Sequence, residues 1–247
     1  MSEFTIADLY SIFQRLNAGK WSGILIGGQA VNLYANHYQE RMPEIELLRP
    51  LASRDLDFHG GPRDAKRAMV ILHATGRIND GTDPSPNAGV LQVLLSSGQV
   101  LIIDILTSVF GISASEMLRS SITWKMSDDA TIEVLHPLLL LESKLACLRS
   151  LNQSDRQDEK HVRLMTQVVS AWLNEQMESP RHVFKAIERI AAMMMTPDGV
   201  SAYEHGIDLW QAMPLIEMRA VEDYQQFFDK RYPQLESQVS QKRGSAD

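Results

Sequence analysis

The chain has only one cysteine, Cys147, among its 247 residues. A single thiol cannot form an internal disulfide, and the histidines show no spacing that would hold a structural zinc ion. Neither a disulfide framework nor a zinc-binding fold is therefore expected. A lack of disulfide-forming cysteines is typical of proteins from a reducing compartment, so we expect a cytoplasmic protein.

Long apolar runs are missing too. The longest, VLIIDIL and PLLLLE, fall far short of the roughly 20 apolar residues that a membrane-spanning helix needs. The N-terminal residues carry Glu3 and Asp8 within an amphipathic pattern, which indicates a helix and not a signal peptide. We therefore expect no membrane partner.

An excess of positive charge is also absent, because the formal net charge is -7. Proteins that grip long nucleic acids mainly through the phosphates carry a broad basic surface, so this class is disfavoured, while a local basic patch remains compatible with the composition. The sequence has no GxSxG elbow and no Walker lysine motif either, which excludes the hydrolases and P-loop enzymes built on them.

Two patterns divide the chain. Over residues 1–135, β-rich runs alternate with amphipathic segments and glycine turns, which predicts an α/β (α+β) domain with a small mixed sheet flanked by helices. Residues 136–235 show only helical spacing and are expected to form a helical domain. Residues 236–247 are polar without a periodic apolar face, so we expect a flexible tail. The predicted helices of the second half cover 137–150, 156–176, 180–195 and 202–228, the last with a break at Pro214.

A glycine pair, Gly27-Gly28, follows a predicted strand over 21–26 and precedes a helical pattern. Glycines at such a turn allow backbone N–H groups to approach a phosphate at the positive end of the helix, which favours a triphosphate site. The same pair also suits a purely conformational turn. Further along, runs at 90–95 and 99–106 flank a Ser-Ser-Gly turn and predict an antiparallel hairpin.

Asp55 and Asp57 lie two apart in a predicted strand, so both carboxylates project from one face while Leu56 and Phe58 point to the other. Two like charges held this closely are unfavourable unless they stay in water or share a cation, and oxygen-rich sites of this kind suit Mg²⁺ or Mn²⁺. The alternative is an exposed edge strand that carries ordinary surface aspartates.

Asp104 lies inside a run in which apolar residues occupy both faces of a predicted central strand. A carboxylate there needs a cation, a basic partner or a proton. A metal ion shared with Asp55 and Asp57 would meet that need, and so would an ion pair with Arg54 or Arg77. The three acids together predict a metal site.

A strand ending in Gly27-Gly28, then Asp55-Leu56-Asp57, then a strand with Asp104 resembles the polymerase-beta-type nucleotidyltransferase superfamily. The resemblance implies the nucleotidyltransferase fold and a site in which the glycine turn contacts the phosphates of a nucleoside triphosphate such as ATP. It also implies that the three acids are catalytic and bind two metal ions. Asp104 would in addition take the proton of the attacking hydroxyl.

The sequence after His136-Pro137 is similar to the abortive-infection branch of that superfamily, the toxins of type IV toxin–antitoxin pairs. This resemblance implies that Lys144 and Asp158 join the nucleotide-binding site and that a cognate partner protein exists. From the residues alone, Lys144 shares a helical face with apolar neighbours and could equally be a surface lysine with a buried stem. The residues of this similarity are Leu140, Lys144, Leu145, Arg149, Arg156 and Asp158.

The chain departs from that branch at three positions. Leu51 and Ser53 stand where the branch usually has arginine and threonine before the first acid, and Gln29 stands where it has a small residue after the glycine pair. The three acids themselves are intact.

The expected function is therefore metal-dependent transfer of a nucleoside monophosphate from a nucleoside triphosphate to an acceptor hydroxyl. The sequence leaves open whether that acceptor is RNA, protein or a small molecule. The rival hypothesis is a non-catalytic nucleotidyltransferase-fold module whose helical half binds a partner protein in a toxin–antitoxin or regulatory complex. Replacement of one acid by Asn or Ser would have favoured that rival, because metal affinity depends on ligand charge.

Overall fold

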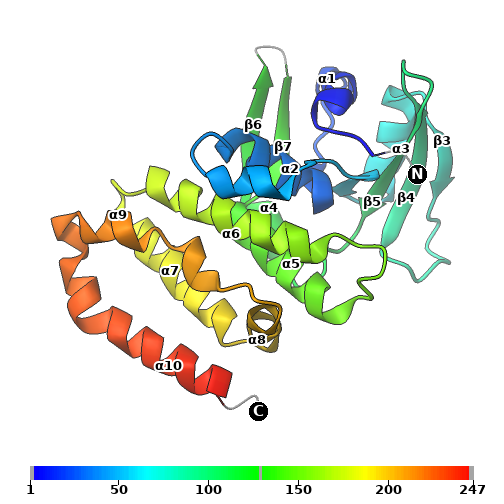
Figure 1. The fold of residues 1–247 in the computed structure, drawn as a ribbon. Coiled ribbons are helices and arrows are strands. Elements are labelled where there is room, and N and C mark those ends of the chain that lie inside the picture. The colour runs from blue at the N-terminus through cyan, green and yellow to red at the C-terminus, as the bar shows by residue number, and fades with distance from the viewer. Residues whose placement is uncertain (1–2, 128–129, 245–247) are drawn as a thin grey trace. The chain divides into compact units, whose positions relative to one another are not determined.

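The computed structural model describes residues 3–127 and 130–244, which form two compact units (Figure 1). One unit comprises Met1–His37 and Arg49–Leu140, and the other comprises Tyr38–Leu48 and Leu141–Asp247. The chain passes between the units within helix α5 (Pro137–Ser150), a few residues after the predicted boundary at 135. The short segment before Arg49 belongs with the helical unit, which no pattern in the sequence indicated.

A mixed seven-stranded sheet forms the centre of the first unit, with strand order β3-β4-β5-β2-β1-β7-β6. β2 and β5 are parallel, whereas β1 with β2 and β4 with β5 are antiparallel, so the predicted hairpin is confirmed. The mixed α/β class is confirmed as well. The strands are β1 (Ile24–Ile26), β2 (Asp55–His59), β3 (Thr75–Ile78), β4 (Asn87–Leu94), β5 (Val100–Leu106), β6 (Ser121–Ser127) and β7 (Ala130–Leu135).

One face of this sheet is packed by helices. α3 (Pro62–Ile71) contacts β3, β4 and β5, and α1 (Tyr10–Ala18) contacts β7. Leu56 and Phe58 are fully buried on this side, and Phe58 meets the Trp21 ring edge to face at 4.7 Å between centroids. Because side chains alternate along a strand, the acids between these residues project from the opposite face.

α2 (Gly27–Tyr38) begins at the residue that follows β1, so the predicted order of strand, glycine pair and helix is confirmed. Its Tyr34 hydroxyl donates to the carbonyl of Leu135 at 3.0 Å, which ties the helix to the end of β7. The remaining short elements of this unit are η1 (Ala7–Leu9) and α4 (Ala114–Arg119).

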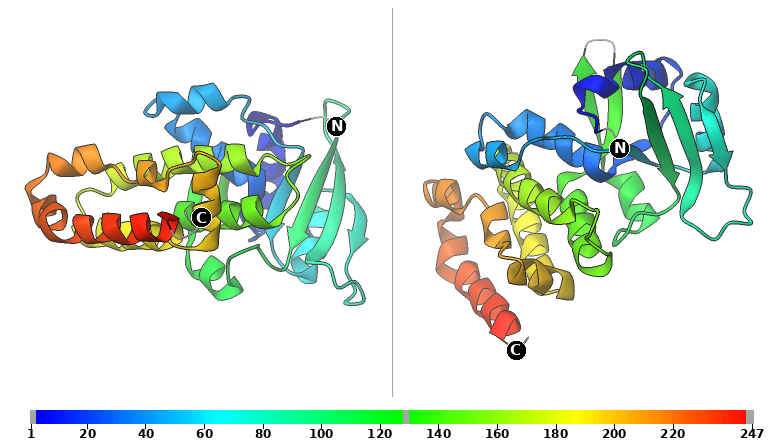
Figure 2. Two further views of the ribbon diagram at one scale, coloured as in Figure 1. Left: turned by 60° about the horizontal axis from the view of Figure 1, so that its bottom comes forward. Right: turned by 45° about the vertical axis from the view of Figure 1, so that its right-hand side comes forward.

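Helices make up the second unit in the part of the chain that is described. α6 (Asp158–Glu175) and α7 (Pro180–Met194) match two predicted helices, and α10 (Tyr232–Gly244) runs alongside α7 (Figure 2). Among the described residues, no helix combines the length and apolarity needed to cross a membrane. The shorter elements are η2 (Pro43–Leu48), α8 (Pro197–Glu204), η3 (Leu209–Ala212), α9 (Leu215–Arg219), η4 (Glu222–Tyr224) and η5 (Phe227–Arg231).

The predicted helix over 202–228 is wrong, because four separate short elements follow α8 before α10 begins. Gly206 adopts φ +69°, a left-handed conformation that ends α8, and Asp208 then accepts a hydrogen bond from the Trp210 N–H to start η3. Pro214 separates η3 from α9, as its lack of an N–H requires. The expected break at Pro214 is real, but Gly206 and Asp208 also interrupt the segment.

The predicted flexible tail over 236–247 is wrong as far as Gly244, because these residues continue α10. Leu235 and Val239, one helical turn apart, form a two-residue apolar stripe that is fully buried. Arg243 pairs with Asp208 at 2.8 Å and lies over the Tyr203 ring at 3.8 Å, which fixes the helix end. Residues 245–247 lie outside the described part of the chain.

Candidate metal centre

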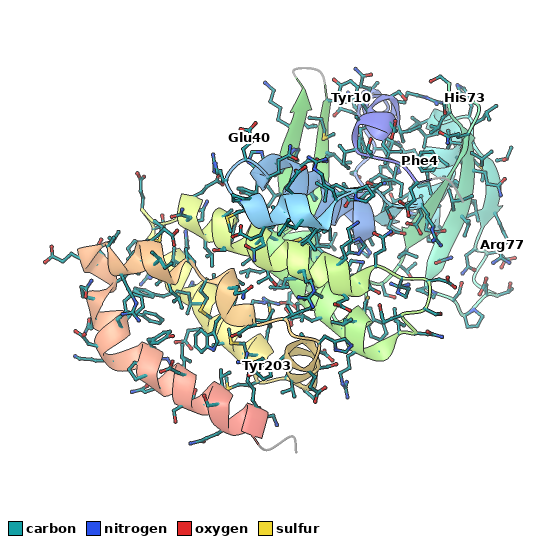
Figure 3. The ribbon with its side chains drawn as sticks, in the orientation of Figure 1. Phe4, Tyr10, Glu40, His73, Arg77 and Tyr203 are labelled. Carbon is teal, nitrogen blue, oxygen red and sulfur yellow. The ribbon has the colours of Figure 1, made fainter. Side chains whose placement is uncertain are left out.

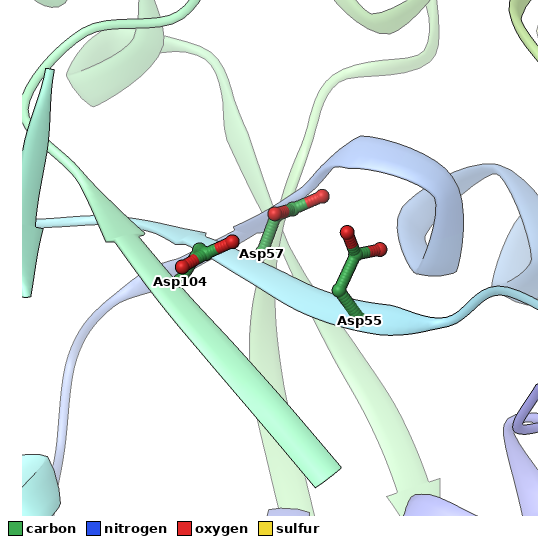
Figure 4. Close-up of side chains that lie close together, drawn as sticks. All are labelled: Asp55, Asp57 and Asp104. Carbon is green, nitrogen blue, oxygen red and sulfur yellow. The ribbon is translucent and has the colours of Figure 1, made fainter. Parts of the chain in front are cut away.

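Asp55, Asp57 and Asp104 converge on one point of the sheet. β2 and β5 are parallel and in register, so Asp57 lies directly opposite Asp104, and Asp55 projects from the same face two residues earlier. The three side chains point toward one another (Figure 4). One carboxylate oxygen from each residue lies within 4.8 Å of the other two. The predicted convergence of the three carboxylates is confirmed.

Gly27 lies against this cluster. Its φ of +68° falls in the left-handed region, where a side chain is strained, and a Cβ atom built there would come 2.0 Å from Oδ2 of Asp57. Glycine is therefore required at this position for both conformation and space. The acids thus lie beside the first residue of α2, at the predicted glycine turn.

The local electrostatics are those of crowded acids. Burial raises the pKa of Asp104, and the neighbouring Asp55 carboxylate raises it further. Asp55 accepts a hydrogen bond from the Ser53 hydroxyl at 3.1 Å. A cation at the common point would relieve the smaller part of this rise in the Asp104 pKa, the part that comes from repulsion by Asp55.

Neither proposed arginine partner reaches Asp104. Arg54 approaches Glu3 at 4.0 Å. Arg77 lies on the edge strand β3 (Figure 3) and pairs with Asp83 at 2.6 Å. Within residues 3–127 and 130–244, Asp104 has no ion pair. The ion-pair explanation for this acid is therefore wrong.

Both strands that carry the acids lie in the interior of the sheet. β2 lies between β5 and β1, so the alternative of an exposed edge strand is wrong. β5 is an interior strand as predicted, but only one of its faces is fully buried, and Asp104 is half-buried on the other. The apolar run therefore overstated how deep this carboxylate lies.

His59 was missed by the sequence argument. It is the third residue of β2 on the face of Asp55 and Asp57, and its Nδ1 lies 3.0 Å from the carbonyl oxygen of Leu106. A carbonyl can only accept, so Nδ1 carries the proton and Nε2 is an acceptor in the neutral ring. The two-residue spacing in Asp-Leu-Asp-Phe-His was the available signal.

Lys144 and Asp158 meet in the second unit, in α5 and at the start of α6. Lys144 Nζ lies 3.0 Å from Oδ1 of Asp158, and the residues are 6% and 1% exposed. The two side chains therefore form a buried ion pair within the second unit. The alternative of a surface lysine with a buried stem is wrong, because the ammonium group itself is buried.

Two neighbours complete this buried group. Arg156 Nε lies 2.5 Å from Oδ2 of Asp158, whereas His161 Nδ1 lies 3.9 Å from Oδ1, beyond hydrogen-bond reach. Burial by itself raises the pKa of Asp158. The contacts of this carboxylate with His161, Lys144 and Arg156 outweigh burial and lower the pKa well below the ordinary range. Burial, reinforced by Lys144, lowers the pKa of His161 to about 4.

Comparison with models of known protein families finds no match for this chain. A search of curated proteins finds no matching relative either. The function therefore has to be argued from the geometry of the acids and their surroundings.

Proposed function

We propose that this protein is a metal-dependent nucleotidyltransferase that moves a nucleoside monophosphate from a nucleoside triphosphate to an acceptor hydroxyl. The observation that carries the proposal is the convergence of Asp55, Asp57 and Asp104 within 4.8 Å of one another, beside a turn that admits only glycine. The resemblance to polymerase-beta-type enzymes in the order and spacing of these residues supports the same proposal.

The donor set fits a hard divalent cation. It consists of three carboxylates without cysteine or histidine, which is the ligand chemistry of Mg²⁺ or Mn²⁺ and not of zinc. No described residue forms an ion pair with Asp104, so a cation bound there would offset the charge of the three acids. Asp55, Asp57 and Asp104 would hold the metal, which would neutralise the triphosphate and the leaving pyrophosphate.

The triphosphate is proposed to lie at the Gly27-Gly28 turn. α2 starts there and is twelve residues long, so its first N–H groups and the positive end of its dipole adjoin the acids. The absence of a side chain at Gly27 makes room for the Asp57 carboxylate beside the start of this helix. The reacting α-phosphorus would then lie over the carboxylates.

The reaction requires little covalent chemistry from the protein. The acceptor oxygen forms a bond to the α-phosphorus while the bond from that phosphorus to the bridging oxygen of the β-phosphate breaks, and pyrophosphate leaves. The hydroxyl proton passes to a carboxylate, and Asp104 is proposed for this role because the resemblance assigns it to the third acid. Orientation and charge neutralisation account for most of the acceleration.

The toxin-like part of the proposal has less support. Lys144 and Asp158 already satisfy each other inside the second unit, so their geometry is explained without a ligand. A role for them in nucleotide binding, and a cognate partner protein, rest on resemblance alone.

The decisive experiment compares the wild type with Asp57→Asn in label transfer. Protein, Mg²⁺ and each α-labelled nucleoside triphosphate are incubated with cell extract, and label is measured in RNA, protein and small molecules. We expect transfer by the wild type and a loss of about 10³-fold in Asp57→Asn, because one charged metal ligand is gone. The apo variant should be at least as stable as the wild type, since repulsion among the acids is relieved.

Asp80→Asn, in an exposed loop of the same unit, is the matched control and should transfer normally. Transfer by Asp57→Asn at the wild-type rate would show that the acids do not perform the chemistry. A wild type that binds no metal and transfers nothing would instead support the non-catalytic interaction module.

A further inference from the structure

A pocket of about 360 Å³ opens at one end of the sheet in the first unit. It lies where β2 and β5 end and β1 begins, and His59 enters it from the strand face that carries the acids. Asp57 and Asp104 each lie two residues before a strand end that borders this pocket. Its lining includes Ser22, Ile24, His59, Asp64, Thr107 and Leu118.

The acids separate this pocket from the glycine turn. β1 and β2 are antiparallel, with Ile26 opposite Asp57 and Ile24 opposite His59. Along the strands, Gly27 therefore lies on one side of Asp57, and the pocket lies on the other side. A triphosphate at the turn and a second group in the pocket would approach the carboxylates from opposite sides, as displacement at phosphorus requires.

The lining is rich in hydrogen-bond acceptors. His59 offers Nε2, because its Nδ1–H is taken up by the Leu106 carbonyl. Asp64 uses Oδ2 to accept the Gly61 N–H at 2.7 Å, and its other oxygen has no partner among the described residues. Thr107 donates its hydroxyl proton to the Pro86 carbonyl, so its oxygen can only accept from a ligand.

Among the described residues, the same lining contains no lysine or arginine, and it includes two apolar side chains. Ile24 is buried at the pocket, and Leu118 stands at its rim with 68% of its surface exposed. Such walls suit the C–H face of a ring, whereas the acceptors suit its hydroxyl groups. A phosphate would find no cation there and would meet the Asp64 carboxylate.

We propose that this pocket holds the sugar ring of the acceptor in the transfer reaction, with no phosphate inside the pocket, and that His59 is a specificity-determining residue. This inference rests on the proposed nucleotidyl transfer. One ring hydroxyl donates to His59 Nε2 or to the Asp64 carboxylate, and its vicinal neighbour is presented to Asp104. The shared chemistry is a ring with vicinal hydroxyls, which either a free sugar or the terminal ribose of an RNA provides.

Four variants test the pocket. His59→Phe keeps a ring but removes Nε2, and Leu118→Trp narrows the opening from an exposed position that tolerates bulk. His59→Gln restores a side-chain acceptor. Leu94→Trp is the matched control, because Leu94 is equally exposed at 71% but lies at the other end of the sheet, opposite Val100.

The assay separates acceptor binding from nucleotide binding. With labelled nucleoside triphosphate and Mg²⁺, we expect His59→Phe and Leu118→Trp to raise the KM for the acceptor pool about tenfold or more. The KM for nucleotide and the thermal shift caused by Mg²⁺ with triphosphate should stay at wild-type values. His59→Gln should recover part of the loss, and Leu94→Trp should behave as the wild type.

The chemistry of the acceptor is tested by treating each pool with periodate, which cleaves vicinal diols, and quenching it before the assay. Transfer to the phosphate-free small-molecule pool or to RNA should disappear, and the pool that carries label identifies the source. Label that enters the protein pool, or that survives periodate, would overturn the sugar assignment. Normal acceptor kinetics in both His59→Phe and Leu118→Trp would overturn the pocket assignment.

Failure of the proposed function gives a different result. A folded wild type that transfers label to no pool with any nucleotide refutes nucleotidyl transfer, and the acceptor site falls with it. If the wild type transfers label and the pocket variants have the same KM for the acceptor, only the acceptor site is refuted.

Discussion

Asp104 in the first unit is half-buried and Asp158 in the second is fully buried, and their pKa values move in opposite directions. Asp158 contacts Lys144 and Arg156, so its charge is balanced inside the protein. Asp104 has two other carboxylates as neighbours and no ion pair among the described residues. Removing a partner of Asp158 would leave a buried charge uncompensated, whereas the three acids of the first unit could hold an external cation.

The largest effect is expected from a mutation that places a positively charged side chain among the three acids. Asp104→Lys should put an ammonium group beside Asp55 and Asp57 and imitate the arrangement of the second unit. We expect a folded protein in which label transfer falls at least about 10³-fold, because the metal loses a ligand and meets a positive charge. The thermal shift with Mg²⁺ should disappear. A variant that still responds to Mg²⁺ would place the cation elsewhere.

The complementary change removes a cation from the balanced group. Lys144→Met should lower the free energy of unfolding by about 3 kcal/mol, because Asp158 stays buried with only the partly exposed Arg156 beside it. Urea unfolding measures the loss. Lys185→Met, an exposed lysine on α7, is the control and should change stability by less than about 0.5 kcal/mol. Equal stabilities for the two variants would show that the buried pair contributes nothing.

Acid pH should also lower the free energy of unfolding, through His161, by less than Lys144→Met does. The pKa of His161 is lowered to about 4 in the folded protein, so between that value and the ordinary 6.5 the unfolded chain binds more protons. Stability therefore falls as pH falls through this window, by about 2 kcal/mol from pH 7 to pH 5. Loss of the Asp158 ion pairs adds to the fall only below about pH 4.

The variant His161→Met should remove the fall between pH 7 and pH 5 in urea unfolding curves. His182→Met, an exposed histidine on α7, should retain it. If His161→Met follows the wild-type pH dependence, the destabilisation comes from another group.

Local patterns predicted the acids well because strand alternation and spacing depend on the sequence alone. The two-residue spacing of Asp55 and Asp57 fixed their common face, and the glycine pair fixed the start of α2. The register of β2 against β5 was beyond local reasoning, since it depends on which strands become neighbours. No strand was predicted at β6, although its apolar residues alternate at Ile122, Trp124 and Met126.

The errors came from the second unit and from residues whose role is tertiary. Leu235 and Val239 are too few to give a periodic signal, but contact with the rest of that unit buries them and orders α10. Gly206 and Asp208 look unremarkable in a helical stretch until the left-handed turn and the new cap are seen. His59 was set aside because the histidines show no spacing that would hold a zinc ion, and no other role was predicted for it.

The contact between Gly27 and Asp57 has a consequence for how this sequence can vary. Because any side chain at 27 would occupy the space of the Asp57 carboxylate, the two positions constrain each other although they lie thirty residues apart. In a library randomised at both, alanine at 27 should survive mainly with a shortened residue at 57, at the expense of the proposed metal ligand. Descendants of this chain that have lost the proposed nucleotidyl transfer would then be recognised by a side chain at position 27.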